Sequence, residues 1–298
     1  MREKKRSAYQ IIANTVMILV TISVILPFLL LFMSSITSED VLLSYGYSLF
    51  PKQFSVESYA YILQSGEKIL RAYGMTMLVT VVGTTVGLLT AALFAYPLSL
   101  SNLPFKKVFN FFVFFTMLFN GGLIPSYIMW TNLFHIKDTV WGLLAPNLLM
   151  NAMNVLMIRT YFANSIPSTL FEAAQIDGAG QFQVFHKVVI PLGKPILVTM
   201  GTFTGLAYWN DWTNGLYYIS KRTDYYTIQN LLNKMVSDLQ FLTSNSNLSA
   251  QAAQEIAKVP STGIQMAIAF IAILPILILF PFLQKYYSKG IMLGAVKG

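Results

Sequence analysis

Residues 168 to 195 read STLFEAAQIDGAGQFQVFHKVVIPLGKP. This interval is polar and charged, whereas most of the chain consists of long apolar runs. Thr169 followed three residues later by Glu172 has the pattern of a capping box, which predicts that a helix begins here. Gly178 and Gly180 predict a sharp turn after this helix, because closely spaced glycines weaken a helix.

A second short helix is predicted after the turn. Phe182, Phe185 and Val189 are spaced three and four residues apart, which places them on one helix face. Pro191 is predicted to end this helix, because proline lacks the N–H donor that a helix interior needs. The stretch is therefore predicted to form a helix–turn–helix that lies between two membrane spans and faces a partner.

The composition indicates a membrane protein. The chain has 298 residues, of which 55% are hydrophobic and 11% are charged, with a mean hydropathy of +0.58. Soluble domains carry about 25% charged residues, so a soluble globular fold is disfavoured. Cysteine is absent, which excludes disulfides and thiolate metal sites. The net charge of +8 is dispersed among apolar runs rather than gathered on one face, so nucleic acid is not an expected partner.

Runs without charged residues mark the membrane spans, because about 20 apolar residues cross a bilayer core. A basic N-terminus precedes the first run and raises the alternative of a signal peptide, but the apolar part is too long for one. The predicted fold class is all-α transmembrane, with one domain over residues 1–298. Its six predicted spans lie at about 11–33, 73–100, 108–130, 139–161, 195–219 and 264–283.

Lysine and arginine predict the orientation, because cytoplasmic loops carry an excess of these residues. With both termini inside, the inner segments hold 12 of the 20 Lys and Arg residues and the outer segments hold 8. The outer residues are also diluted over longer loops. Both termini and the segment at 163–194 are therefore predicted to be cytoplasmic.

No catalytic constellation appears in the sequence. H-E-x-x-H and G-x-S-x-G are absent, and the two histidines, His135 and His186, are predicted to lie on opposite sides of the membrane. The phosphate-binding pattern G-x-x-x-x-G-K-[ST] is also absent, so hydrolysis of ATP by a P-loop mechanism is excluded. We therefore predict no catalytic residues, no metal site and no enzyme activity. An active transporter built on this chain would need another subunit to supply the energy.

The helix–turn–helix stretch carries a known motif. Glu172-Ala173-Ala174, then Gly178 after three residues, then Val188-x-Ile190-Pro191 after nine more, resembles the EAA motif of ABC importer permeases. The Asp177-Gly178-Ala179 variant is similar to the carbohydrate-type permeases. Two further stretches, NGGLIP at 120–125 and the ending at 281–298, resemble the oligosaccharide-type branch. The likeness covers essentially the whole chain.

In that family this segment forms cytoplasmic coupling helices that sit in a cleft of the ATP-hydrolysing subunit. The resemblance implies a coupling segment at 163–194 whose ATPase-coupling residues are Glu172, Ala173, Ala174, Asp177, Gly178, Phe182 and Phe185. Glu172 has two open interpretations, as a helix cap and as a contact to the ATPase. Asp177 either caps the second helix or pairs with a cation of the partner.

The resemblance also implies the assembly and its location. The chain would be a permease subunit in the bacterial cytoplasmic (plasma) membrane that imports oligosaccharides by alternating access. The implied partners are a second, homologous permease subunit forming a heterodimer, two ATP-binding subunits that hold ATP and Mg, an extracytoplasmic solute-binding protein and the lipid bilayer. No cofactor is expected in this chain.

Two alternatives to this function remain open in the sequence. One is an ATP-independent secondary transporter or channel, and the other is an ABC permease for a non-sugar solute. Secondary transporters often bury several ionisable residues for ion coupling, whereas this chain places one acidic residue, Asp211, inside a predicted span.

Polar side chains inside the predicted spans are candidates for a substrate path. Asn147, Asn151 and Asn154 are spaced by four and three residues and are predicted to share one face of the fourth span. They either hydrogen-bond to neighbouring helices or line the path. Asn120 lies where the third span is predicted to break.

The fifth predicted span contains a second group of candidates. Its members are Trp209, Asn210, Asp211 and Trp212. Aromatic residues near the end of a span usually form an interfacial belt, but an acidic residue in the same turn argues against a purely lipid-facing role. The stretch resembles a Trp-Asn-Asp-aromatic sequence in the corresponding span of carbohydrate permeases.

Overall fold

The computed structural model describes residues 8–64, 66–244 and 261–295. These residues are predominantly helical, and they contain no β-strand beyond an isolated bridge between Thr37 and Phe54. The predicted all-α class is therefore confirmed. The chain divides into two units, residues 1–67 with 232–276 and residues 68–231 with 277–298.

Apart from Gly66 and Glu67, which begin helix α4 (Gly66–Ser99), the first unit contains three whole helices and parts of two others. They are α1 (Ala8–Ser35), α2 (Glu39–Tyr45), α3 (Glu57–Gln64), most of α14 (Ile228–Ser244) and the first part of α16 (Ser261–Ala295). The Glu39 carboxylate accepts hydrogen bonds from the backbone N–H groups of Thr262 at 2.9 Å and Gly263 at 2.8 Å. It thereby caps the N-terminus of α16, where a negative charge is stabilising.

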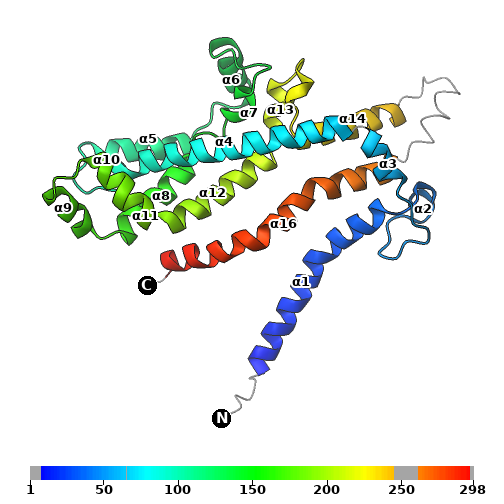
Figure 1. Ribbon diagram of the computed structural model, residues 1–298, viewed down its shortest axis with the longest axis horizontal. Coiled ribbons are helices and arrows are strands. Elements are labelled where there is room, and N and C mark those ends of the chain that lie inside the picture. Colours follow the sequence, from blue (N-terminus) through cyan, green and yellow to red (C-terminus); the bar gives the residue numbers. More distant parts are fainter. Residues whose placement is uncertain (1–7, 65, 245–260, 296–298) are drawn as a thin grey trace. The chain divides into compact units, whose positions relative to one another are not determined.

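The second unit holds the remaining described elements. They are α4 (Gly66–Ser99, which begins in the first unit), α5 (Lys106–Leu118), α6 (Leu123–Ile128), the π-helix η1 (Met129–Leu133), α7 (Trp141–Leu144), α8 (Ala152–Ser165), α9 (Ser168–Ile176), α10 (Gln181–Val184), the π-helix η2 (Phe185–Val189), α11 (Ile190–Leu192), α12 (Lys194–Trp209), α13 (Thr213–Tyr218) and the 3-10 helix η3 (Thr223–Tyr225). Helices α4 and α12 lie side by side (Figure 1).

Close packing of α4 on α12 depends on a small residue. A Cβ atom at Gly83 of α4 would overlap the ring of Tyr208 of α12. The Tyr208 side chain is 1% exposed, and its hydroxyl donates to the carbonyl oxygen of Leu144 at 2.8 Å. Glycine therefore allows the two helices to approach, as small residues do at helix interfaces in membranes.

Some helices are long and apolar enough to cross a membrane by themselves. Two of the described helices meet this test, Tyr9–Ser35 within α1 and Gly66–Ser99 of α4. Two pairs meet it only when each bent pair counts as one span: Lys106–Leu118 with Leu123–Leu133, bent by 109°, and Gln181–Leu192 with Lys194–Trp209, bent by 79°. The predicted break near Asn120 is thus confirmed, and the count of six spans stays a prediction.

The fourth predicted span is not a continuous helix. Helix α7 ends at Leu144 and α8 begins at Ala152, with Pro146 and Asn147 between them. Asn147 has a φ of 62°, in the left-handed region, so the α-helix cannot continue through it. The prediction that Asn147, Asn151 and Asn154 share one helix face is therefore wrong.

Candidate functional site

The predicted capping box at the start of the coupling segment is also wrong. Helix α9 begins at Ser168 and follows Pro167, whose backbone is extended (φ −61°, ψ 133°). Thr169 therefore lies within the first turn, and no side chain caps this helix. Glu172 is exposed in the middle of α9. The structure therefore excludes the interpretation of Glu172 as a helix cap, and its interpretation as a contact to the ATPase stays a prediction.

The predicted turn between the two helices is confirmed. Gly178 has a φ of 79°, which favours glycine. The second helix starts after Gly180, whose N–H donates to the side-chain oxygen of Gln183 at 3.3 Å. Asp177 follows the end of α9 and does not cap this second helix. Its exposed carboxylate stays a candidate for pairing with a cation.

The second helix differs from its prediction at its end. The rings of Phe182 and Phe185 lie side by side, with centroids 6.5 Å apart, although Phe182 is 74% exposed whereas Phe185 and Val189 are buried. Pro191 does not end the helical path, which continues to Leu192. Proline is tolerated there because it lies in the first turn of α11, after the π-helix η2. The bend to α12 occurs at Gly193, where a Cβ atom would overlap the ring of Phe162.

Tyr96, near the end of α4, attaches the coupling segment to the rest of the second unit. Its hydroxyl donates to the side-chain oxygen of Gln181 at 2.7 Å. Its ring lies 6.2 Å from that of Phe171 and 5.5 Å from that of Phe185, measured between centroids. Sequence reasoning missed this residue, since a tyrosine near the end of a span usually indicates an interfacial belt.

Part of the coupling segment is also buried in the largest apolar cluster found among the described residues of this unit. Residues of α10 and η2 contribute to this cluster together with α4, α8 and α12; the buried members from the coupling segment are Ile166, Val184, Phe185 and Val189. Ala174 packs against it from α9, whereas Ala173 is exposed. The base of the coupling segment is therefore closely packed against α4, α8 and α12.

The tip of the coupling segment presents apolar side chains to solvent. Ile176, at the end of α9, is 86% exposed, and Phe182, at the start of α10, is 74% exposed. Large exposed apolar groups that flank a turn are typical of a surface that is covered by a partner. Ile176 was not among the predicted coupling residues, although its apolar side chain next to the turn is a signal that the sequence contains.

A cavity of about 1000 Å³ lies beside this tip. It is bounded by the end of α4, the turn at 99–104, the end of α8 and the faces of α9 and α10. Glu172 lines it and is the acidic residue there, together with the uncharged polar residues Gln175 and Gln181. An anionic group beside exposed apolar side chains suits a partner that offers a basic side chain.

The candidate path residues gather at two helix breaks in the second unit. Asn151 is the N-cap of α8, where its side-chain oxygen accepts from the N–H groups of Met153 at 2.9 Å and Asn154 at 3.4 Å. The Asn154 amide donates to the Thr204 hydroxyl of α12 at 2.9 Å. These two asparagines therefore have structural roles, while Asn147 is exposed in the break between α7 and α8.

The second break separates α12 from α13. The Asp211 carboxylate caps α13 by accepting from the N–H groups of Thr213 at 3.0 Å and Asn214 at 3.3 Å. The Asn214 amide donates to the carbonyl oxygen of Pro146 at 3.0 Å, which joins the two breaks. Capping at the break supplies a partner for backbone N–H groups that have none within the helix.

The remaining candidates divide into buried and exposed side chains. Trp209 is 4% exposed and lies against Tyr73 of α4, with ring centroids 6.4 Å apart. Asn210 is exposed, and Trp212 is 45% exposed. Asn120 is exposed and accepts from the N–H of Gly122 at 2.8 Å, so it caps the turn between α5 and α6. Among the described residues no group of three His, Asp or Glu side chains is placed to hold a metal ion.

Comparison with known proteins identifies the chain's family. Residues 83–292 match the family described as "Binding-protein-dependent transport system inner membrane component". The chain belongs to this family. Its members are the permease subunits of ABC importers, so the resemblance read from the EAA motif is confirmed.

Similar members of the family are known in sequence and in structure. The Bacillus subtilis protein LplC is 36% identical over 92% of this chain and 90% of its own length. The polygalacturonan/rhamnogalacturonan transport system permease protein YtcP of B. subtilis is 34% identical over 92% and 93%. One chain in the crystal structure of a bacterial ABC transporter involved in the import of the acidic polysaccharide alginate superposes with a TM-score of 0.80, at 26% identity, over 96% of this chain and 99% of that chain.

Proposed function

We propose that this permease is one of two homologous membrane subunits of an ATP-driven importer for oligosaccharides. Support for a carbohydrate comes from two similar transporters, YtcP, named for polygalacturonan and rhamnogalacturonan, and the transporter involved in alginate import. The proposed orientation places both termini and residues 163–194 in the cytoplasm, which agrees with the excess of Lys and Arg in the inner segments. Two ATP-binding subunits would bind ATP and Mg, and a solute-binding protein would deliver the sugar outside.

The proposed coupling role is supported by one observation: the tip of the coupling segment is exposed, whereas its base is buried. Ile176 and Phe182 offer apolar area for a partner, while Phe185 and Val189 lie within the core of the second unit. Closure of the ATP-binding subunits would displace this segment and so change the side of the membrane to which the substrate path is open. Glu172, exposed and without a capping role, is the proposed polar contact.

The exposed side chains at the two helix breaks are the proposed sugar contacts. Asn147 and Asn210 offer amide donors and acceptors, and Trp212 offers an indole face. Sugars bind through these two kinds of group, because their hydroxyls need hydrogen-bond partners and their C–H faces pack on aromatic rings.

The coupling assignment is tested with the assembled transporter in proteoliposomes. Uptake of labelled oligosaccharide should require ATP and the binding protein. Glu172→Ala should lower the sugar-stimulated rate of ATP hydrolysis about tenfold, since a hot-spot contact contributes on the order of 1–2 kcal/mol. Glu57→Ala, which removes an exposed carboxylate from α3, is the control and should retain the rate. Retention of full stimulation in an assembled Glu172→Ala complex would remove the main support for the coupling role.

The path assignment is tested by a tryptophan substitution. Trp212→Ala should lower the maximal rate of sugar uptake up to about tenfold, because an aromatic contact is worth about 0.5–1.5 kcal/mol. Phe109→Ala is the control, since Phe109 is 52% exposed but lies on α5 rather than at either of the two breaks. Equal uptake by both variants would exclude Trp212 from the path.

A further inference from the structure

The loop that follows α13 is held by a single carboxylate. Asp138 accepts hydrogen bonds from three consecutive backbone N–H groups, those of Ser220 at 2.7 Å, Lys221 at 2.8 Å and Arg222 at 3.3 Å. It also accepts from the Ser220 hydroxyl at 3.1 Å. The N–H of Asp138 itself donates to the carbonyl oxygen of Tyr218 at 2.8 Å. These contacts hold the backbone at residues 220–222 in place.

The same contacts keep Asp138 charged. Burial raises the pKa of its carboxyl, but the hydrogen bonds from Lys221, Ser220 and Arg222 outweigh burial and lower the pKa from 3.8 to about 2. A carboxyl whose pKa is lowered in the folded state contributes its stabilisation above its unfolded pKa, and the contribution is lost only as the pH falls through about 2. The loop therefore keeps its attachment over the whole physiological pH range.

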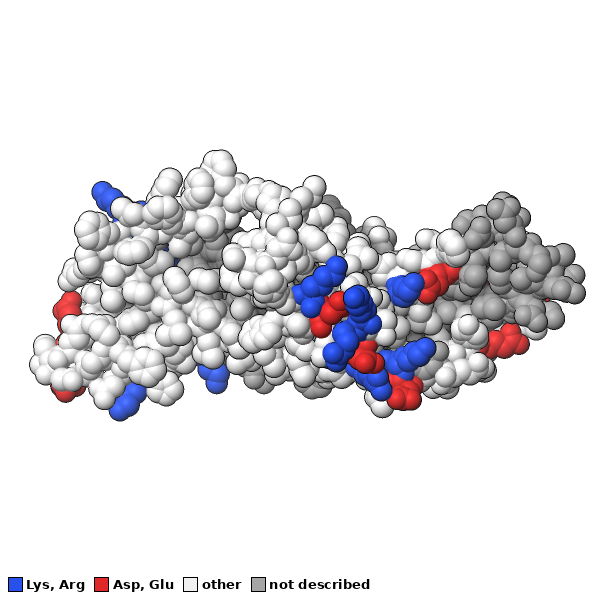
Figure 2. All heavy atoms as spheres, turned by 90° about the horizontal axis from the view of Figure 1, so that it is seen from above, with Lys and Arg blue, Asp and Glu red and all other residues white. Residues whose placement is uncertain are grey.

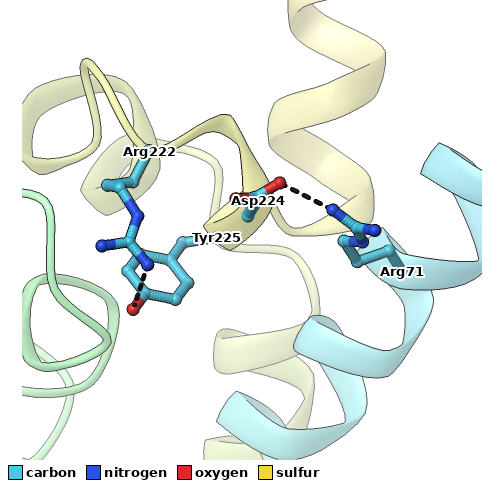
Figure 3. A network of polar contacts seen from close by, with 4 residues as sticks. All are labelled: Arg71, Arg222, Asp224 and Tyr225. Atoms are coloured by element: carbon cyan, nitrogen blue, oxygen red, sulfur yellow. Dashed lines mark hydrogen bonds and ion pairs between the residues drawn. The ribbon is translucent and has the colours of Figure 1, made fainter.

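Cationic side chains around this loop are held in fixed directions (Figure 3). Arg71 of α4 pairs with Asp224 at 2.7 Å between Nη1 and Oδ1. The Arg222 guanidinium lies over the ring of Tyr225, 4.7 Å from its centroid, and donates to its hydroxyl at 3.0 Å. On the neighbouring connection, the Lys137 ammonium donates to the Tyr127 hydroxyl at 3.0 Å.

This end of the second unit has an excess of positive charge. Its cations are Lys68, Arg71, Lys137, Lys221 and Arg222, its carboxylates are Asp138 and Asp224, and one further carboxylate, Glu67, directly precedes Lys68 in α4. Asp138 and Asp224 are both used within the unit, one by the backbone of the loop and one by Arg71. Charged side chains gather over one part of the molecular face in Figure 2, beside a surface that is largely uncharged.

We propose that Arg71, Lys137, Lys221 and Arg222 form a docking surface for an acidic face of a soluble protein. We name it the 220–226 surface. Resting on the function proposed above, we assign this partner as the extracytoplasmic solute-binding protein, and Asp138 is the positioning residue of the surface. Positive charge that meets negative charge across an interface steers association and selects the partner.

The composition and rigidity of the surface favour a protein as its occupant. Arginine and tyrosine are enriched where proteins bind each other. A loop already held by four hydrogen bonds to Asp138 loses little further freedom on binding. A sugar is disfavoured because the aromatic rings are already engaged: Tyr127 stacks on Tyr218 with centroids 5.8 Å apart, and Arg222 covers Tyr225.

The test uses the assembled transporter in nanodiscs and the binding protein that supports uptake in the transport assay. ATP hydrolysis is measured while this binding protein is titrated, at low and at high salt. The double charge reversal Lys221→Glu with Arg222→Glu should raise the half-saturating concentration about tenfold at low salt, with the maximal stimulated rate retained. The difference from the unaltered chain should shrink at high salt, because exposed charges are screened. Asp138→Asn should raise the half-saturating concentration in the same direction without lowering the maximal rate.

The control is Lys107→Glu, an exposed lysine in the first turn of α5. Helix α4, 34 residues long, separates it from Arg71 by on the order of 40 Å. For this variant, the half-saturating concentration of the binding protein should equal that of the unaltered chain. An unchanged half-saturating concentration in the double reversal, or an equal change in Lys107→Glu, would overturn the proposal.

Two further results separate this proposal from the proposed function. If no binding protein stimulates the unaltered complex, the importer function fails, and the charge variants are not the cause. If an acidic oligosaccharide alone stimulates it and the double reversal abolishes that effect, the surface binds sugar rather than protein and the proposal is wrong. If the double reversal prevents assembly, Lys221→Gln with Arg222→Gln decides the question, with a smaller expected shift in the same direction.

Discussion

Gly83→Ala is expected to lower the free energy of unfolding of the assembled permease by about 2–4 kcal/mol. The added methyl group would overlap the ring of Tyr208, which is 1% exposed and has no room to move. To accommodate it, α4 and α12 must separate, or the Tyr208 hydroxyl must release the carbonyl oxygen of Leu144. Either response removes packing or leaves a buried polar group without its partner.

Thermal unfolding of the purified complex in nanodiscs measures this effect. Gly74→Ala is the matched control, because it lies on the same helix and a Cβ atom there would meet nothing within 4 Å. Alanine is favoured over glycine in a helix by up to about 1 kcal/mol, so this variant should be neutral or stabilising. Equal transition temperatures for the two variants would contradict the close packing of α4 against α12.

Ile176→Ser combined with Phe182→Ser is expected to weaken binding of the ATP-binding subunits about 30-fold or more. This estimate corresponds to a loss of at least about 2 kcal/mol for truncation of central apolar anchors. Both side chains are largely exposed, at 86% and 74%, so the permease itself should keep its fold. Transport should fall because the motion of the ATPase no longer reaches the spanning helices.

Binding of purified ATP-binding subunits to the permease pair in nanodiscs measures the loss directly. Ile124→Ser is the control, since Ile124 is 72% exposed but belongs to α6. The control removes one exposed apolar side chain outside the coupling segment and should bind the ATP-binding subunits normally. Unaltered binding by the double variant would show that the tip of the coupling segment is not an anchor.

Much of the fold could be predicted from local patterns. Charge-free runs locate α1 and α4, because a bilayer span demands length and apolarity that are visible in any window of the sequence. The turn at Gly178 and the break near Asn120 are equally local, since glycine adopts positive φ at both, as Gly178 and Gly122. The EAA motif identified the family on the same local basis.

Predictions that depended on where a helix begins or breaks were wrong. Thr169 and Glu172 have the spacing of a capping box, but Pro167 starts the helix earlier. Asn147, Asn151 and Asn154 have helical spacing, but Pro146 and the left-handed Asn147 interrupt the helix. Spacing predicts a shared face only if the helix is continuous, and continuity here is decided by contacts such as that between Asn214 and Pro146.

By itself the sequence determined that this chain is helical and membrane-embedded, that it lacks the P-loop pattern, and that it carries the EAA segment of its family. These properties follow from composition and from spacing along a few turns. Only the tertiary structure decided which side chains of that segment are buried, as Phe185 is, and which are exposed, as Ile176 and Phe182 are. The reason is physical: burial depends on Tyr96 of α4, which is distant in the sequence, and on the way α8 and α12 fold back against the segment, and these contacts exist only in the folded protein.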